Sequence, residues 1–188
     1  MRALLVSSLL CCAADASAAT YVDEPALGHW AAVTGVHAGS TVQTPELRAF
    51  GGAGVRVGTG YQWDSGIGVY AESGFAARAG EGPTSAFTAQ KASIQEWSFG
   101  LSLRWVVLTT DVAPFVEGSV HGVWVRVRSP VPTDLGGTLF TGKLGVRVRL
   151  DGWEPYLALQ GERLISGSAE ETLCSTRLGL AIGVTFDL

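Results

Sequence analysis

The chain has 188 residues, of which 47% are hydrophobic, and it carries a net charge of −4 at neutral pH. This length fits a single domain, and this hydrophobic content excludes a disordered chain. A weakly acidic chain lacks the excess of basic residues that is typical of nucleic-acid-binding proteins, so we expect no nucleic-acid partner.

The first twenty residues, MRALLVSSLLCCAADASAAT, are typical of a secretory signal peptide. An apolar run follows Arg2, and Ala16 and Ala18 form an A-x-A cleavage site. We therefore predict a signal peptide over residues 1–18 and one mature domain over residues 19–188. These first residues carry one basic and one acidic side chain, so the mature chain keeps the same net charge.

The three cysteines exclude a disulfide framework. Cys11 and Cys12 leave a lipoprotein as a less favoured alternative, because Leu10 is large where a lipobox has a small residue. Only Cys174 remains after cleavage, so no intrachain disulfide can form. We expect it to be a lone exposed thiol in the last long loop.

Strands are the only elements that the mature sequence offers for crossing a membrane. No stretch after the signal peptide approaches the roughly 20 continuous apolar residues that a spanning helix needs. Eight segments instead alternate between apolar and polar residues, with about the 9–11 residues of a membrane-crossing strand or slightly more. They are residues 29–39, 50–63, 67–78, 93–107, 113–127, 138–150, 154–165 and 175–188.

The connections alternate between short and long. Asp and Gly residues indicate tight turns in the short ones, at about 64–66, 108–113 and 151–153. The long connections are predicted at about 40–49, 79–92, 128–137 and 166–174. This asymmetry is typical of an outer-membrane barrel, and an even strand number places both termini on the short-turn side.

Alternation alone does not distinguish a membrane barrel from a soluble sheet. In the fourth segment, for example, Trp97 to Trp105 form an apolar face, and Glu96 to Arg104 form a polar one. The charges on the second face and the aromatic residues near the strand ends favour a membrane location. These aromatic residues are Tyr61, Trp63, Trp97, Trp105, Trp124 and Trp153.

The mature chain resembles the small eight-stranded outer-membrane β-barrels of Gram-negative bacteria, the OmpA transmembrane domain and OmpX-like group. Its terminal RLGLAIGVTFDL is similar to that group's C-terminal assembly signal, with Ile182, Val184, Phe186 and Leu188 on the apolar face. It departs from the pattern because Leu188 stands where the family most often has an aromatic residue.

The resemblance implies an all-β fold, an eight-stranded antiparallel up-and-down transmembrane β-barrel. It also implies an outer-membrane location with both termini periplasmic, and contact with membrane lipid, lipopolysaccharide and the barrel-assembly machinery. We expect a monomer without a cofactor or a bound metal.

A barrel of eight strands has an interior that side chains can fill. The inward parity gives six basic and six acidic residues, and we predict a balanced network in the lumen that also includes Ser119 and His121. A narrow conduction path stays open as an alternative. The charged residues are Arg56, Arg104, Lys143, Arg147, Arg149 and Arg177, with Glu72, Glu96, Glu117, Glu154, Glu162 and Asp187.

The motif EGSVH places the residue types of a hydrolytic triad, Glu117, Ser119 and His121, on one face of one strand. Alternate strand residues are about 6.6–6.8 Å apart, too far for a direct Ser–His hydrogen bond without favourable rotamers. We therefore predict no catalytic residues and assign these side chains to the lumen network.

Lipid A deacylases and palmitoyltransferases are small outer-membrane barrels and form the enzymatic alternative. A deacylase-like His-x-Ser pair is absent in that order. His29 with Asp64 and Ser65 has the residue types of a palmitoyltransferase, but these residues fall at the periplasmic rim. His29 and His37 lie about 26 Å apart along one strand, which no single metal ion can bridge.

Three arginines, Arg126, Arg128 and Arg163, have outward parity near the long loops. Guanidinium groups bind phosphates bidentately, so these residues are candidates for contact with lipopolysaccharide. The equal alternative is that they are simply solvated. The expected function is a structural or surface-interaction role, and a secreted soluble barrel remains a further alternative.

Overall fold

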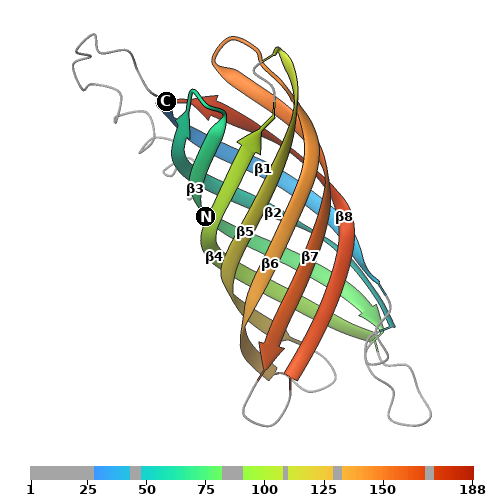
Figure 1. Cartoon of the computed structure of the whole chain (residues 1–188). Coiled ribbons are helices and arrows are strands. Elements are labelled where there is room, and N and C mark those ends of the chain that lie inside the picture. Colours follow the sequence, from blue (N-terminus) through green and yellow to red (C-terminus); the bar gives the residue numbers. More distant parts are fainter. Residues whose placement is uncertain (1–27, 43–47, 82–90, 108–109, 129–132, 168–171) are drawn as a thin grey trace, which may run out of the picture.

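In the computed structural model, residues 28–42, 48–81, 91–107, 110–128, 133–167 and 172–188 are described, and they form a closed barrel of eight strands (Figure 1). The predicted signal peptide lies outside the described residues. Within them, no helix is long and apolar enough to cross a membrane. The strands are β1 (Gly28–Val42), β2 (Arg48–Trp63), β3 (Ile67–Glu81), β4 (Lys91–Val106), β5 (Val112–Val127), β6 (Thr133–Val148), β7 (Trp153–Gly167) and β8 (Thr172–Asp187).

Every strand pairs antiparallel with its neighbours in the sequence, and β1 closes the barrel by pairing with β8. The closing register runs from Ala31 opposite Asp187 to Val42 opposite Thr176. Closure satisfies the backbone hydrogen bonds of both terminal strands, so the sheet has no free edge. The predicted eight-stranded antiparallel up-and-down barrel is confirmed.

Two glycines make the tight turns possible at one end of the barrel, which we name the turn end. Gly66 has φ of +83° after β2, and its backbone N–H donates to the carbonyl of Trp63 at 2.9 Å. Gly152 has φ of +74° between β6 and β7. Glycine adopts this left-handed conformation without steric cost. The turn end also holds Gly28 and Asp187, and β1, β3, β5 and β7 finish at the opposite end.

Several strands extend further toward the opposite end than the alternating pattern predicts. The sixth strand begins at Thr133 rather than at about residue 138, and its ladder with β5 continues through Gly136 and Gly137. Cys174 lies on β8, opposite Ile165, so its predicted place in a loop is wrong. Backbone pairing requires no apolar side chain, so the strands continue where the sequence pattern fades.

Large apolar side chains cover the outside of the barrel. Phe99 is 70% exposed and Leu159 64%, although water would not favour either. We name this surface the apolar belt. Its members include Val36, Val55, Val57, Val69, Phe75, Phe99, Leu101, Leu103, Val116, Val120, Phe140, Leu144, Val146, Leu157, Leu159, Leu178, Leu180 and Ile182.

Candidate functional site: the barrel interior

The interior contains charged side chains from every strand except β1, which contributes His37. Of the fourteen residues predicted for the lumen network, all but Arg149 and Asp187 have buried side chains, and none of the buried ones is more than 6% exposed. The buried ones are Arg56, Glu72, Glu96, Arg104, Glu117, Ser119, His121, Lys143, Arg147, Glu154, Glu162 and Arg177. The structure divides them into four groups along the barrel axis.

The first group, toward the opposite end, is the arginine–glutamate cluster of Arg56, Arg78, Glu96, Glu162 and Arg177. Arg56 and Arg78 donate hydrogen bonds to Glu162 at 3.2 and 2.8 Å. Arg78 also donates to Glu96 at 3.3 Å, and Arg177 donates twice to Glu96, at 2.8 and 2.5 Å. Each carboxylate is therefore shared between guanidinium groups from different strands.

The second group lies toward the turn end and centres on Glu117. Its carboxylate accepts hydrogen bonds from Arg104 at 2.8 Å and from Lys143 at 2.5 Å. The guanidinium of Arg104 also lies 5.0–5.2 Å from the ring centroids of Tyr70, Phe115 and Tyr156. Aromatic faces favour a nearby cation, so these rings stabilise the buried charge of Arg104.

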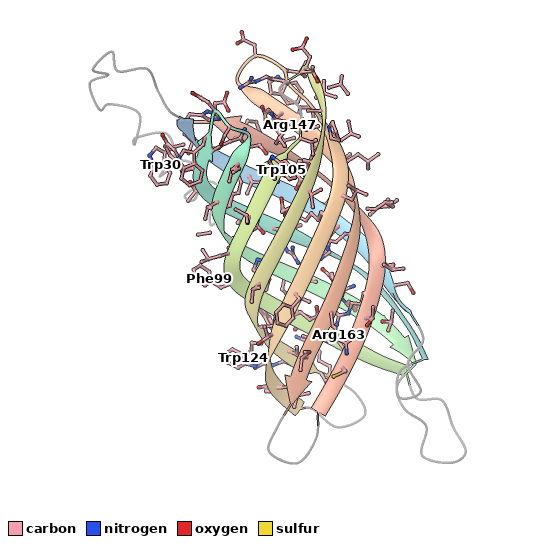
Figure 2. The ribbon with its side chains drawn as sticks, in the orientation of Figure 1. Trp30, Phe99, Trp105, Trp124, Arg147 and Arg163 are labelled. Carbon is pink, nitrogen blue, oxygen red and sulfur yellow. The ribbon has the colours of Figure 1, made fainter. Side chains whose placement is uncertain are left out.

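The third group is the pair of Arg147 and Glu154 on β6 and β7, at the turn end (Figure 2). Arg149 approaches the same carboxylate at 3.5 Å, but its side chain is 47% exposed. The predicted inward position of Arg149 is therefore wrong. Asp187 is also exposed and pairs across the β1–β8 seam with His29, at 3.1 Å. Strand parity loses its meaning at the rim, where a side chain of either parity reaches solvent.

The fourth group lies in the middle of the interior. It brings together a serine, a histidine and a glutamate, the residue types of a catalytic triad, from two strands. The Oγ of Ser119 lies 3.4 Å from Nδ1 of His121, whose Nε2 lies 3.5 Å from Glu72. The acid comes from β3 rather than from Glu117, and the rotamers bring Ser119 and His121 closer than the strand spacing suggested. Both distances are longer than the roughly 2.6–3.2 Å of the hydrogen bonds that join the members of a working triad.

This group is sealed from substrate. Ser119 is 6% exposed and His121 1%, and Glu72 also accepts a hydrogen bond from Ser102 at 2.9 Å. An acyl ester or amide therefore has no route to the serine. None of the described His, Cys, Asp and Glu residues gather in a group of three that could hold a metal ion.

Sequence reasoning missed Arg78, which is only 3% exposed and joins Glu96 to Glu162. Its parity matches that of Glu72, but it falls at the last residue of the predicted third strand. With Arg78 inside and with Arg149 and Asp187 at the rim, the described interior holds six cations and five carboxylates, not a balanced set.

Apolar clusters lie toward both ends of this charged interior. The turn-end apolar cluster consists of Ala31, Val33, Tyr70, Val106, Ala113, Phe115, Tyr156 and Ala158. The opposite apolar cluster consists of Ile94, Val123, Val125, Leu139 and Leu164. The interior charges lie beside these clusters, since Arg78 is opposite Ile94 and Glu96 is opposite Val125 in the strand register.

Aromatic residues flank the apolar belt. Trp30 and Trp105 lie near the turn end, Trp124 lies toward the opposite end, and Phe99 lies between them (Figure 2). The predicted girdle residues Trp63, Trp97, Trp105, Trp124 and Trp153 are all 39–56% exposed, whereas Tyr61 is half-buried. Sequence reasoning missed Trp30, which is 59% exposed and packs edge-on against Tyr61.

The three outward arginines differ in their surroundings. Arg126 donates two hydrogen bonds to Asp134, at 2.9 and 3.3 Å, and lies over the ring of Trp97. Arg128 and Arg163 are exposed, and no ion pair among the described residues involves them. His29 pairs with Asp187, while Asp64 and Ser65 are exposed in the turn after β2.

Comparisons with known proteins concern the fold. No protein-family model matches the chain, and no curated protein matches its sequence. Neisserial surface protein A is similar in structure, with a TM-score of 0.64 and 10% identity, over 85% of this chain and 97% of that chain. Outer Membrane Protein W of E. coli has a TM-score of 0.49 and 10% identity, over 88% of this chain and 100% of its own. This chain therefore has the fold of the small eight-stranded outer-membrane β-barrels.

Proposed function

We propose that the protein is a non-enzymatic outer-membrane barrel of a Gram-negative bacterium, with a closed lumen and a structural or surface-interaction role. The observation that carries this proposal is the inverted distribution of its side chains. Charged residues fill the inside and the apolar belt covers the outside. This distribution is stable when the outer surface contacts lipid and unfavourable when it contacts water.

The height of the apolar belt fits a membrane. Trp97 and Trp105 flank the apolar face of β4 and are eight residues apart. At about 3.4 Å per residue and a tilt of about 40°, this separation corresponds to roughly 21 Å along the barrel axis. The apolar band of outer-membrane barrels is about 25 Å tall, and aromatic residues border it.

The interior argues against a pore. Two cavities among the described residues are lined in part by the arginine–glutamate cluster, and each has room for about one water molecule. The apolar clusters toward both ends further oppose a continuous path for hydrated ions. We therefore expect the barrel not to conduct.

The chemistry of the interior supports a structural role rather than catalysis. The serine, histidine and glutamate in the middle of the barrel contact one another, but they face neither lipid nor the outer rim. A lipid A-modifying enzyme needs its nucleophile where an acyl chain can reach it. Neither the Ser119 site nor the exposed Asp64 and Ser65 turn meets this requirement.

We further propose that the turn end, with both termini, faces the periplasm. The opposite end would then lie in the outer leaflet, where Arg128 and Arg163 would meet the phosphates of lipopolysaccharide. Ile182, Val184, Phe186 and Leu188 would serve as the assembly signal for the barrel-assembly machinery. The mature protein is expected to work as a monomer without a cofactor.

Membrane fractionation combined with heat-modifiable gel migration tests the barrel and its compartment together. We expect the protein in the outer-membrane fraction and a band that shifts only after boiling in detergent. In planar bilayers the purified barrel should give no single-channel steps. Recovery in the soluble fraction without detergent would contradict the membrane location, and reproducible conductance would contradict the closed lumen.

A further inference from the structure

We propose that the arginine–glutamate cluster holds one halide ion, such as chloride, in a buried pocket between Arg56 and Arg78. We name this cavity the halide pocket. Its polar lining consists of His37, Arg56, Arg78, Glu96, Ser98 and Glu162. This site goes beyond the proposed function, because a closed structural barrel does not require it.

The charges around the halide pocket do not balance. Three guanidinium groups of the arginine–glutamate cluster share the two carboxylates of Glu96 and Glu162. The described interior as a whole also has one cation more than it has carboxylates. An uncompensated charge is costly in a medium of low polarity, so an interior with this composition favours the uptake of one monovalent anion.

Two arginines that line this cavity, Arg56 and Arg78, have hydrogen-bond donors without a partner. Arg56 has no partner at Nε or Nη1, and Arg78 has none at Nη1. Both side chains are more than nine-tenths buried, at 7% and 1% exposure. Guanidinium N–H groups can only donate, so these three positions call for an acceptor.

The two carboxylates do not prevent anion binding, because each already accepts from arginines. Glu96 accepts two hydrogen bonds from Arg177 and one from Arg78, and Arg56, Arg78 and Gln160 donate to Glu162. The free donors of Arg56 and Arg78 are those left after these contacts. A halide would accept from them without displacing a carboxylate.

The size of the pocket selects the class of anion. It has room for about one water-sized species, which suits a monatomic halide and excludes sulfate, phosphate and organic anions. A single water molecule would also fit, but it would leave the surplus charge in place. The charge balance therefore favours the ion over water.

Urea unfolding of the detergent-solubilised barrel tests the site, with sodium chloride exchanged for sodium gluconate at constant ionic strength. Each tenfold rise in chloride above its dissociation constant should lower the unfolding equilibrium constant about tenfold. Arg56→Met removes the surplus cation and should abolish this dependence. Arg163→Met removes an exposed arginine outside the barrel and should retain it.

Crystals grown in sodium bromide provide a second measurement that needs no variant. An anomalous peak between Arg56 and Arg78 would support the site, even if Arg56→Met does not fold. Unfolding that is independent of chloride in the unaltered protein would overturn the proposal. So would water-like density without an anomalous peak in the halide pocket.

Discussion

Arg177 donates two hydrogen bonds to Glu96, at 2.8 and 2.5 Å, across the interior of the barrel. The two residues lie on β8 and β4, which do not neighbour each other in the strand order. The pair therefore ties opposite walls of the barrel together. Arg78 reaches the same carboxylate from β3, so three strands meet at Glu96.

Glu96→Gln should strongly destabilise the barrel. The substitution keeps the size of the side chain but removes the charge that Arg78 and Arg177 share, so the three buried guanidinium groups of the cluster are left with Glu162 as their one carboxylate. Breaking a buried pair in this way costs about 3–5 kcal/mol. Equilibrium urea unfolding, followed by tryptophan fluorescence in lipid vesicles, measures the change.

Asp134→Asn is the matched control for this substitution. Asp134 pairs with Arg126, but both side chains are nearly half exposed, so solvent already screens the interaction. The free energy of unfolding of Asp134→Asn should remain close to that of the unaltered protein. Equal effects of the two substitutions would show that the interior pairs contribute no more than surface pairs.

Gly183→Ala should also destabilise the barrel, by overpacking. A Cβ at Gly183 would lie 2.5 Å from the hydroxyl oxygen of Tyr156 and would clash with the backbone carbonyl of Thr34. The ring of Tyr156 has little freedom to move, because it packs against Phe115 and Arg104. Overpacking of this kind costs about 1–3 kcal/mol in unfolding free energy.

Gly118→Ala separates this steric effect from a general effect of replacing glycine. A Cβ at Gly118 meets no atom within 4 Å, and Gly118 faces outward on β5. The alanine should be neutral or slightly stabilising, because glycine costs conformational entropy in a strand. Equal shifts of the urea midpoint in Gly183→Ala and Gly118→Ala would contradict the packing argument at Gly183.

The sequence predicted the barrel better than it predicted the contacts inside it. Period-two alternation is local, so the strands and the outward position of residues such as Phe99 and Leu180 follow from the sequence pattern. The partners of a buried charge come from distant strands. Nothing in the sequence near His121 indicates that its acid is Glu72 on β3 rather than Glu117 on its own strand.

The errors fall where strands end, for a related physical reason. Arg78 was missed at the end of a predicted strand that extends to Glu81, and Arg149 was placed inside although it reaches solvent. The alternation of apolar and polar residues indicates only the part of a strand whose side chains contribute to the apolar belt. Hydrogen-bonded pairing and solvent access determine what happens beyond it, and both depend on the closed barrel.

Replacing both Arg128 and Arg163 with Gln should reduce the lipopolysaccharide that copurifies with the barrel. Both arginines are exposed, and no ion pair among the described residues engages them, so their guanidinium groups are free to bind phosphate. The measurement is the ratio of lipid phosphate to protein after gentle detergent extraction.

Arg126→Gln is the control, because Nε and Nη2 of Arg126 already donate to the two carboxylate oxygens of Asp134. This variant should retain most of its lipopolysaccharide. An unchanged phosphate ratio in the Arg128 and Arg163 double variant would show that these arginines are merely solvated.

Ile182→Lys tests whether the apolar belt faces lipid. Ile182 is 57% exposed and pairs with Val36 on β1 and Leu157 on β7, in the middle of the outer surface. A lysine near the centre of a bilayer costs a transmembrane barrel about 2–4 kcal/mol, whereas an exposed lysine in water costs almost nothing. The free energy of urea unfolding in lipid vesicles and the fraction of heat-modifiable protein in cells should both fall for this variant.

Ile182→Val is the control, because it keeps the apolar surface and should behave like the unaltered protein. Normal assembly of Ile182→Lys with an unchanged free energy of unfolding would place this face in water and contradict the outer-membrane location.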